Sequence, residues 1–404
     1  MIRNRIVYNE YCGYRIKLSR AEGSSLWDEH GKRYIDFTSG WNVTNLGWNH
    51  PEIAAAIAEQ AHKNVYAPLW GSDPIQEEYA EKLTAALPKE LDACVKATGG
   101  TEAVEESIKI ARAATGRKKI VGFKHTYHGQ LFAAMALGYT PDAVQDIAPL
   151  VPEFIQLNWP RDTGAGDVLR NFLNELEEML AKKDTAALVT EPSIVTGWGS
   201  MLIAPHEYLK GVRELTARYG TLLIVDEVGT GFSRTGKLFG IEHETVTPDM
   251  ICLAKGMSNG GAAIGAVVGK SAVIEPTIPS TNLTSTFGWT PIACAAALKT
   301  LDVHQREKVW EQSASKGIYM MNHLKSKLAI HPSVKDIRGM GMEIGIEMKK
   351  DAARYKKIFN SATNNGLHLV GDTESLIQLM PPLTISQNDL DEGLNILVRA
   401  FSSV

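Results

Sequence analysis

Short apolar runs alternate with amphipathic stretches along the chain from about residue 90 onward. Each run is about as long as one strand, and the runs are 93–98, 118–123, 154–158, 186–191, 222–227, 250–255 and 263–269. The stretches between them have the apolar spacing of half-buried helices, and they are 101–116, 168–183 and 206–220. Continuous apolar strands that alternate with helices predict a parallel sheet covered by helices on both faces.

The pattern changes after Pro291. The chain is helical to about Leu328, and a mixed region follows with strand-like residues at 334–348, a helix near 351–364 and further short apolar runs. This order predicts a separate small α+β domain, whose boundary falls within a helix between about residues 300 and 325.

Composition narrows the class of protein. The chain has 404 residues, of which 44% are hydrophobic and 22% charged, as in ordinary globular proteins of two or three domains. The net charge of −4, without runs of like charge, argues against a nucleic-acid partner. No apolar run approaches about 18 residues, and the N-terminus lacks the apolar core of a signal peptide, so we expect a cytoplasmic protein without membrane contact. The four cysteines, at 12, 94, 252 and 294, lack CxxC spacing and predict neither a metal site nor a disulfide framework.

Two chemically useful side chains stand at the ends of apolar runs. Asp226 follows Leu222–Val225, and Lys255 follows the run that begins at Met250. Ligands of α/β sheets bind at the carboxyl ends of the strands, so both side chains fall where a site is expected. Each also has an ordinary explanation, because a strand-end lysine can extend to solvent and an aspartate can cap a turn.

A glycine-rich turn lies between the first apolar run and the first helix. Gly99, Gly100 and Thr101 would place backbone N–H groups and a hydroxyl at the helix N-terminus, which is an anion site suited to a phosphate. The turn is not a P-loop, since no Gly-Lys-Ser/Thr follows it, and GMGMEIG at 339–345 lacks the spacing of a dinucleotide fingerprint.

Tyr127 and His128 follow the second apolar run, at the same predicted sheet edge. An aromatic ring there could stack on a flat ligand, although ordinary packing explains either residue alone. The predicted site thus combines a phosphate-binding turn, an aromatic ring, a carboxylate and an amine. Together these groups fit pyridoxal 5′-phosphate (PLP). Lys255 would form an imine with its aldehyde, and Asp226 would keep its pyridine nitrogen protonated.

The order of the motifs resembles that of the class III aminotransferases over nearly the whole chain. The matching stretches are RAEGSSLWDEHGKRYIDFTSG (20–40), LGWNHPEIAAAIAEQ (46–60), GGTEAVEESIKIAR (99–112), YHG (127–129), VTEP (189–192), DEVGTGFSRTGKLFG (226–240), AKGMSNG (254–260) and TSTFGWTPIACAAAL (284–298). The resemblance implies the α/β architecture called PLP fold type I. Its large domain holds a mixed, mostly parallel sheet covered by helices, and its small α+β domain combines N- and C-terminal segments. The expected divisions are 1–45, 46–310 and 311–404.

The resemblance also implies roles around the cofactor ring. Lys255 looks like the Schiff-base lysine that also transfers the proton, and Asp226 like the partner of the pyridine nitrogen. Val228 and Tyr127 are expected on the two ring faces. Glu191 is expected near the cofactor's O3′ hydroxyl.

Gly100 and Thr101 are expected to hold the phosphate. Thr286 matches a residue that reaches the phosphate from the partner subunit, which implies a homodimer with shared sites, in which dimers could pair into tetramers. Glu227 and Arg234 fit the motif but are expected to hold local structure.

Three departures from the family pattern bear on the substrate. Gly229 has no side chain where the family usually has Gln, Met or Ile, so a hydrogen bond to the cofactor hydroxyl is expected to be lost. Gln378 stands where many members have an arginine that binds the α-carboxylate of glutamate or 2-oxoglutarate, and glutamine cannot form that bidentate ionic contact. The stretch 193–200 also lacks the glutamate that often pairs with the arginine, so the site is not expected to be built for glutamate.

Tryptophans fall in segments that border the family's active site, namely Trp41, Trp70, Trp198 and Trp289. Bulky apolar walls would favour an aromatic or alkyl amine, although core or subunit-interface positions would explain each of them equally well. We therefore predict an ω-transaminase that moves the amino group of a primary amine without an α-carboxylate to a keto acid such as pyruvate, in a ping-pong cycle.

Two alternatives stay open. One is an ω-amino acid aminotransferase of the acetylornithine, ornithine, 4-aminobutyrate or diaminobutyrate type, with pyruvate or 2-oxoglutarate as acceptor. The other is a PLP racemase or aminomutase, which would keep Lys255 and Asp226 but consume no acceptor.

Overall fold

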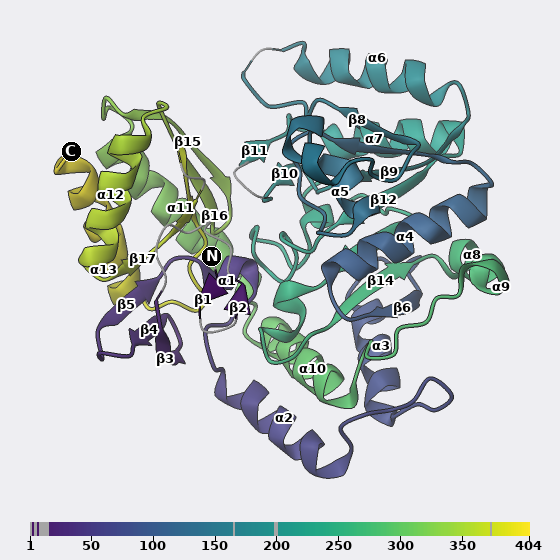
Figure 1. Cartoon of the computed structure of the whole chain (residues 1–404), viewed down its shortest axis with the longest axis horizontal. Coiled ribbons are helices and arrows are strands. Elements are labelled where there is room, and N and C mark those ends of the chain that lie inside the picture. Colours follow the sequence, from purple (N-terminus) through teal and green to yellow (C-terminus); the bar gives the residue numbers. More distant parts are fainter. Residues whose placement is uncertain (1, 4–5, 8–15, 165, 198–200, 372–373) are drawn as a thin grey trace.

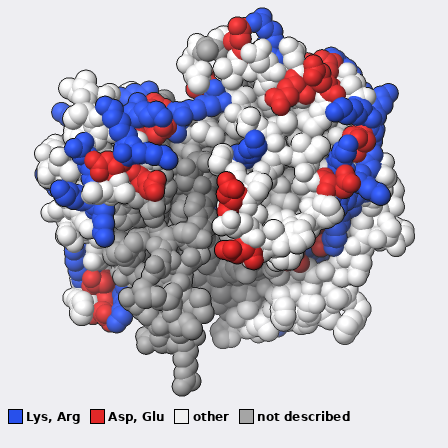
Figure 2. All heavy atoms as spheres, turned by 45° about the horizontal axis from the view of Figure 1, so that its top comes forward, with Lys and Arg blue, Asp and Glu red and all other residues white. Residues whose placement is uncertain are grey.

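A computed structural model describes residues 2–3, 6–7, 16–164, 166–197, 201–371 and 374–404. Figure 1 shows two parts, a larger one around one wide sheet and a smaller one that contains the C-terminus and the strands β3–β5. Among the described helices, none is long and apolar enough to cross a membrane. Basic and acidic side chains lie interspersed over both parts on the face shown in Figure 2.

The larger part is built on a seven-stranded sheet. In spatial order its strands are β6 (Ala93–Ala97), β14 (Gly265–Gly269), β13 (Met250–Leu253), β12 (Leu222–Asp226), β9 (Thr185–Thr190), β7 (Lys119–Phe123) and β8 (Phe154–Leu157). All seven predicted strands are present. The expectation of a parallel sheet is wrong at β14, which pairs antiparallel with both neighbours, whereas β13, β12, β9, β7 and β8 run parallel. The connection from β13 to β14 carries only a 3-10 turn, Lys255–Ser258, and no helix that could return the chain for a parallel pairing.

Apolar layers cover both faces of this sheet. Leu223 and Val225 of β12 pack on one side with α6 (Val168–Leu180) and α7 (Tyr208–Tyr219), and Ile224 packs on the other side with α4 (Gly100–Thr115) and α5 (Phe132–Gly138). Because side chains alternate along a strand, a strand covered on both faces is apolar throughout. The same first layer takes side chains from α3 (Pro74–Ala85) and α10 (Pro291–Arg306).

The smaller part contains two four-stranded sheets. One has the order β15 (Val334–Met340), β16 (Glu343–Met348), β19 (Leu376–Leu379) and β18 (Val370–Gly371), and the other β17 (Leu367–His368), β5 (Arg33–Asp36), β4 (Ser25–Asp28) and β3 (Leu18–Glu22). Parallel pairing of β5 with β17 joins strands from the two ends of the chain. One apolar core connects these sheets with α11 (Val309–Leu328), α12 (Ala352–Asn364) and α13 (Gln387–Ser402).

Eight further helices and strands belong to the described chain, besides short 3-10 turns. They are β1 (Ile2–Arg3), β2 (Ile6–Val7), α1 (Ser39–Asn42), α2 (Pro51–Lys63), β10 (Ile194–Val195), β11 (Leu202–Ile203), α8 (Ser271–Ile274) and α9 (Ile278–Thr281). Helix α2 packs along α10, below the two parts in Figure 1.

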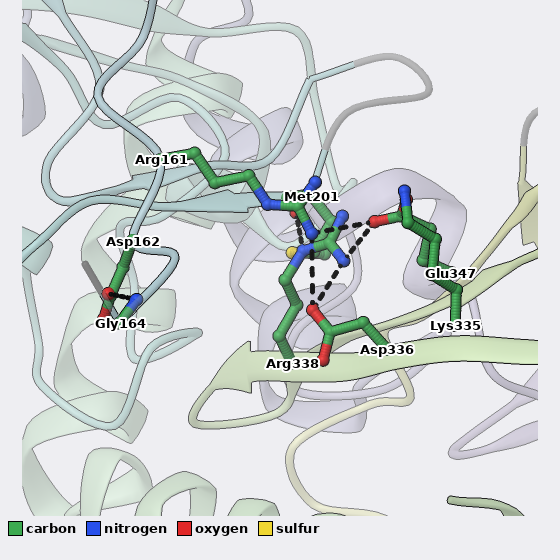
Figure 3. Close-up of polar contacts among 8 residues, drawn as sticks. All are labelled: Arg161, Asp162, Gly164, Met201, Lys335, Asp336, Arg338 and Glu347. Atoms are coloured by element: carbon green, nitrogen blue, oxygen red, sulfur yellow. Dashed lines mark hydrogen bonds and ion pairs between the residues drawn. The ribbon is translucent and has the colours of Figure 1, made fainter. Parts of the chain in front are cut away.

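A network of charged groups joins the two parts (Figure 3). Arg161, which follows β8, lies 3.0 Å from Glu347 of β16 and 3.5 Å from Asp336 of β15. Arg338 of β15 contacts both carboxylates and also donates to the backbone oxygen of Met201. These contacts hold the smaller part against two segments of the larger part, the one after β8 that contains Arg161 and the one that contains Met201.

Candidate active site

A cavity of about 510 Å³ opens at the carboxyl ends of the central strands. Its walls come from residues at the strand ends and the loops after them, and from Trp41 and Val43 of the N-terminal region; the former are 98–101, 127–129, 191, 196–197, 226, 228–229, 254–255, 258, 260 and 262–264. Both parts of the molecule therefore contribute, and most of the residues expected around a cofactor lie in this one space.

Asp226 ends β12 and is almost completely buried. Its Oδ2 lies 2.7 Å from Nδ1 of His128, and its Oδ1 accepts from the backbone N–H of Val228 at 2.9 Å. Burial of His128 opposes its positive form, but the hydrogen bond and charge of Asp226, together with the charge of Glu191, raise the pKa of this imidazole overall. His128 therefore orients the carboxylate of Asp226. The sequence predicted His128 at this edge of the sheet with Tyr127 but indicated no role for it in the site.

Lys255 lies two residues after the end of β13 and starts the 3-10 turn that leads toward β14. Its φ of 47° lies in the left-handed region, which costs energy for a residue with a side chain and often marks a functional position. Burial lowers the pKa of Lys255, although the carboxylates of Asp226, Glu191 and Glu343 oppose that shift. A larger share of the amine is therefore neutral, and only the neutral amine is a nucleophile.

Helix α4 begins at Gly100, and its preceding residue, Gly99, supplies no side-chain cap. The first N–H groups of this 16-residue helix therefore face the cavity as an anion site. Close packing surrounds it: a Cβ on Gly100 would lie 2.9 Å from both methyl groups of Val228, and one on Gly129 would lie 2.4 Å from Oγ1 of Thr101. A residue with a side chain would therefore not fit at either position, because Val228 and Thr101 pack too closely against the two glycines.

Tyr127 and Val228 line the cavity, as does Gly197, where a Cβ would lie only 2.7 Å from the Cβ of Tyr127. The structure thus brings together Tyr127, Val228 and the anion site. Stacking of the two side chains on opposite faces of a ring remains a prediction.

Glu191 follows β9 and is 3% exposed. Its Oε2 accepts from the backbone N–H of Thr196 at 2.8 Å and from the Thr196 hydroxyl at 2.7 Å, whereas its buried Oε1 has no hydrogen-bond partner. Burial raises the pKa of Glu191 to about 7. A Cβ on Gly229 would lie 2.2 Å from the Thr196 Oγ1, so the threonine hydroxyl fills the space beside this glycine. Sequence reasoning missed Thr196, and the only hint was the absent side chain at Gly229.

Trp41 lines the cavity from the smaller part. It belongs to α1 (Ser39–Asn42), whose four residues all have positive φ values, so this short turn is left-handed. Side-chain hydrogen bonds hold it: Ser39 donates to the backbone oxygen of Met380, and Asn42 donates to Glu343 at 2.9 Å. Buried partners thus keep the indole at the wall.

The other tryptophans do not support the expected apolar walls. Trp70 is 90% exposed and lies outside the cavity. Trp289 is buried against Tyr79 and donates from Nε1 to the backbone oxygen of Gly265 at 2.7 Å, so it belongs to the core and does not line the cavity. Trp198 lies outside the described residues.

Gln378 and Thr286 lie outside the cavity lining. Gln378 is fully buried in β19, and its Nε2 donates to the backbone oxygen of Thr196 at 3.4 Å, so it supports the cavity wall from behind. Thr286 is exposed in the loop before α10, and its contribution to a partner's site remains a prediction.

The family model described as aminotransferase class III matches residues 8–401. The chain belongs to the class III aminotransferases. It is 35% identical to the acetylornithine aminotransferase of Methanopyrus kandleri over 97% of this chain and 96% of that protein. It is 33% identical to the [LysW]-aminoadipate semialdehyde transaminase of Deinococcus radiodurans, over 98% of this chain and 88% of that protein.

A solved structure is similar throughout. The (S)-enantioselective omega-transaminase of Thermomicrobium roseum superimposes with a TM-score of 0.89 at 31% identity, over 96% of this chain and 93% of that one. The predicted fold, PLP fold type I with a mixed sheet and helices, is confirmed.

Class III aminotransferases depend on PLP, and the residues of this chain fit that cofactor. A phosphate matches the N–H groups at the start of α4, and a protonated pyridine nitrogen matches the buried carboxylate of Asp226. The aldehyde matches Lys255, whose pKa is lowered. The unpartnered Oε1 of Glu191 offers a further polar contact. The aminotransferase therefore has a partner for each charged or reactive group of PLP.

Proposed function

We propose that this aminotransferase takes the amino group from a primary amine whose reacting carbon carries no carboxylate. Among the described residues that line the cavity, Lys255 is the only lysine or arginine, and the chemistry itself requires it. Asp226 and Glu191 line the same space. The described lining thus holds no arginine that would select donors with a carboxylate on the reacting carbon, although the keto-acid acceptor brings such a carboxylate in the second half of the reaction.

The donor favoured by the comparisons is an ω-amino acid. The relative from Methanopyrus is an acetylornithine aminotransferase and the one from Deinococcus acts on an aminoadipate semialdehyde derivative, as their names state. In an ω-amino acid the amine and the carboxylate are at opposite ends, so the reacting carbon satisfies the requirement above. This class, one of the two alternatives that the sequence leaves open, is thus at least as well supported as a simple amine.

A second candidate donor is an arylalkyl amine without any carboxylate. Trp41, Val43 and Ile264 give the cavity an apolar surface on which such a group could pack. The similarity to an omega-transaminase supports the same candidate. In both cases the acceptor is a keto acid, with pyruvate or 2-oxoglutarate as the first to test.

Different residues of the site would have different roles in the reaction. Bound PLP supplies an electron-accepting ring that stabilises negative charge on the carbon next to the amino group. Asp226, oriented by His128, holds the proton at the pyridine nitrogen. Lys255, once free, would take a proton from the donor carbon as a general base and deliver it, as a general acid, to the cofactor carbon that carried the aldehyde. The N-terminus of α4 anchors the phosphate, so the reacting groups stay beside Lys255.

We also propose that the enzyme works as a homodimer. In the single chain the loop with Thr286 is exposed, and its neighbour Phe287 is 65% exposed and contacts the ring of Tyr66. Leu69 and Trp70, which are close to Tyr66 in the sequence, are also exposed. Large exposed apolar side chains of this kind are typical of a protein interface.

The first experiment is an absorption titration of the PLP-loaded protein without acceptor. N-acetylornithine and 1-phenylethylamine are added in turn, and loss of the visible band of lysine-bound cofactor is followed, with the Lys255→Ala variant as the control that has no such band. A response to N-acetylornithine alone supports the ω-amino acid donor, and a response to the aryl amine alone supports the second candidate. A response to glutamate or alanine but to neither N-acetylornithine nor 1-phenylethylamine would refute the proposal. Turnover that needs no keto acid would instead indicate a racemase or mutase.

A further inference from the structure

Gly229 and Thr196 share one small volume of the cavity wall. A Cβ at position 229 would lie 2.2 Å from Oγ1 of Thr196, far closer than two atoms can approach without a bond or hydrogen bond. The same point lies 3.9 Å from Nζ of Lys255. The threonine hydroxyl thus stands close to the reactive amine, in the place where any larger residue at 229 would put its side chain.

Thr196 also determines how Glu191 is oriented. Both its N–H and its hydroxyl donate to the same oxygen of Glu191, Oε2, at 2.8 and 2.7 Å. The other oxygen, Oε1, is buried and has no partner, although Glu191 lines the cavity. An unpaired buried oxygen is costly unless a ligand completes its hydrogen bond, so this atom indicates a polar group of the bound cofactor.

We propose that Thr196 is a positioning residue, which orients Glu191 so that Oε1 forms a hydrogen bond with the ring hydroxyl of PLP. The phosphate, the pyridine nitrogen and the aldehyde already have partners in α4, Asp226 and Lys255. The ring hydroxyl is the remaining polar group, and it is adjacent to the aldehyde on the ring. The resemblance to the family places Glu191 near this hydroxyl, and the structure adds Thr196 as the residue that replaces a side chain at Gly229.

The proposal predicts a specific pattern in four variants, all measured as PLP-loaded protein without substrate. Thr196→Val keeps the shape but removes the donated hydrogen bond, whereas Thr196→Ser keeps the hydroxyl. Gly229→Ala places a Cβ against the hydroxyl. In the double variant Thr196→Ala/Gly229→Ala the closest remaining atom is the Cβ at 196, at 3.3 Å, so the clash is relieved.

Two readouts are used, the dissociation constant for PLP and the pH midpoint of the visible band of lysine-bound cofactor. Loss of one hydrogen bond predicts that Thr196→Val binds PLP about threefold to tenfold more weakly. We also expect a clearly shifted pH midpoint, because the ring hydroxyl is next to the titrating group, and wild-type behaviour in Thr196→Ser. Gly229→Ala should weaken PLP binding, and addition of Thr196→Ala should recover part of that loss.

Wild-type affinity and pH midpoint in Thr196→Val would overturn the proposal, as would a fully tolerated Gly229→Ala or a double variant that binds PLP no better than Gly229→Ala. Circular dichroism of each apoprotein checks that the variants fold. Since no donor is present, failure here is distinguishable from an error in the proposed substrate class.

Discussion

Glu227 is adjacent to Asp226 in the chain but is held outside the cavity. It is fully buried, and its carboxyl accepts from the hydroxyl of Thr230 and from the backbone N–H of Ile241. Neither donor is charged, so burial raises the pKa of Glu227 to about 7 from its ordinary value of 4.5. Glu227→Gln has nearly the same shape, keeps an acceptor for one donor and does not titrate.

The expected effect follows from proton linkage. Because the folded pKa is raised, the stability that the carboxyl contributes is fully present below about pH 4.5 and is lost as the pH rises to about 7. The full loss is about 3.4 kcal/mol, since each pKa unit corresponds to about 1.4 kcal/mol. About 1.4 kcal/mol of it has been lost at pH 5.5 and about 3.3 kcal/mol at pH 8, a difference of about 2 kcal/mol between these conditions.

Urea unfolding of the apoprotein at pH 5.5 and pH 8, at one protein concentration, measures this difference. Between these pH values Glu227→Gln should lose about 2 kcal/mol less stability than the wild type. Glu191 and Glu343, whose pKa values burial also raises to about 7, are present in both proteins and cancel in the comparison. Glu178→Gln, at an exposed helix position, is the matched control and should follow the wild type. Parallel pH dependences of wild type and Glu227→Gln would refute the reasoning.

Three further predictions concern the reaction and the connection between the two parts. Lys255→Ala should lose the visible band and all turnover, measured by absorption and by product formation. Asp226→Asn should still bind PLP but should turn over about tenfold to a hundredfold more slowly, because a charged partner of the ring is lost; wild-type turnover would contradict its role. Arg161→Ala should destabilise the protein by about 0.5–1 kcal/mol in low salt and by less in high salt, measured by urea unfolding, because its contacts with Asp336 and Glu347 are partly exposed.

The strands of the larger sheet could be predicted because most of them are apolar on both faces and the two outer ones, β6 and β8, are still mainly apolar. The direction of β14 could not, because an apolar run looks the same in either direction. It depends on the length of the connection after Lys255, which is too short for a helical crossover. Pairing of β5 with β17 joins segments more than 300 residues apart, and only the family resemblance anticipated it.

The site could be predicted where a side chain follows directly from a strand, as for Asp226 and Lys255. Thr196 could not, since its position depends on how the loop after β9 folds back onto Glu191. The tryptophans illustrate the same limit. Trp41 and Trp289 both fall in segments that border the family's active site. Trp41 lines the cavity and Trp289 lies in the core, because the position of each side chain depends on the residues that pack around it.

Asp226 and Glu227 follow one another at the end of the same strand, yet they do different work. Asp226 lies in the cavity beside His128, a partner that can become positive and whose pKa its charge raises. Glu227 meets only uncharged donors, and burial pushes its pKa toward neutrality. Asp226 thus faces a partner that can become positive, whereas burial disfavours a negative charge on Glu227, which accepts hydrogen bonds from the loop that follows the strand. The difference arises from the neighbouring groups, since both residues are carboxylic acids with almost the same intrinsic pKa.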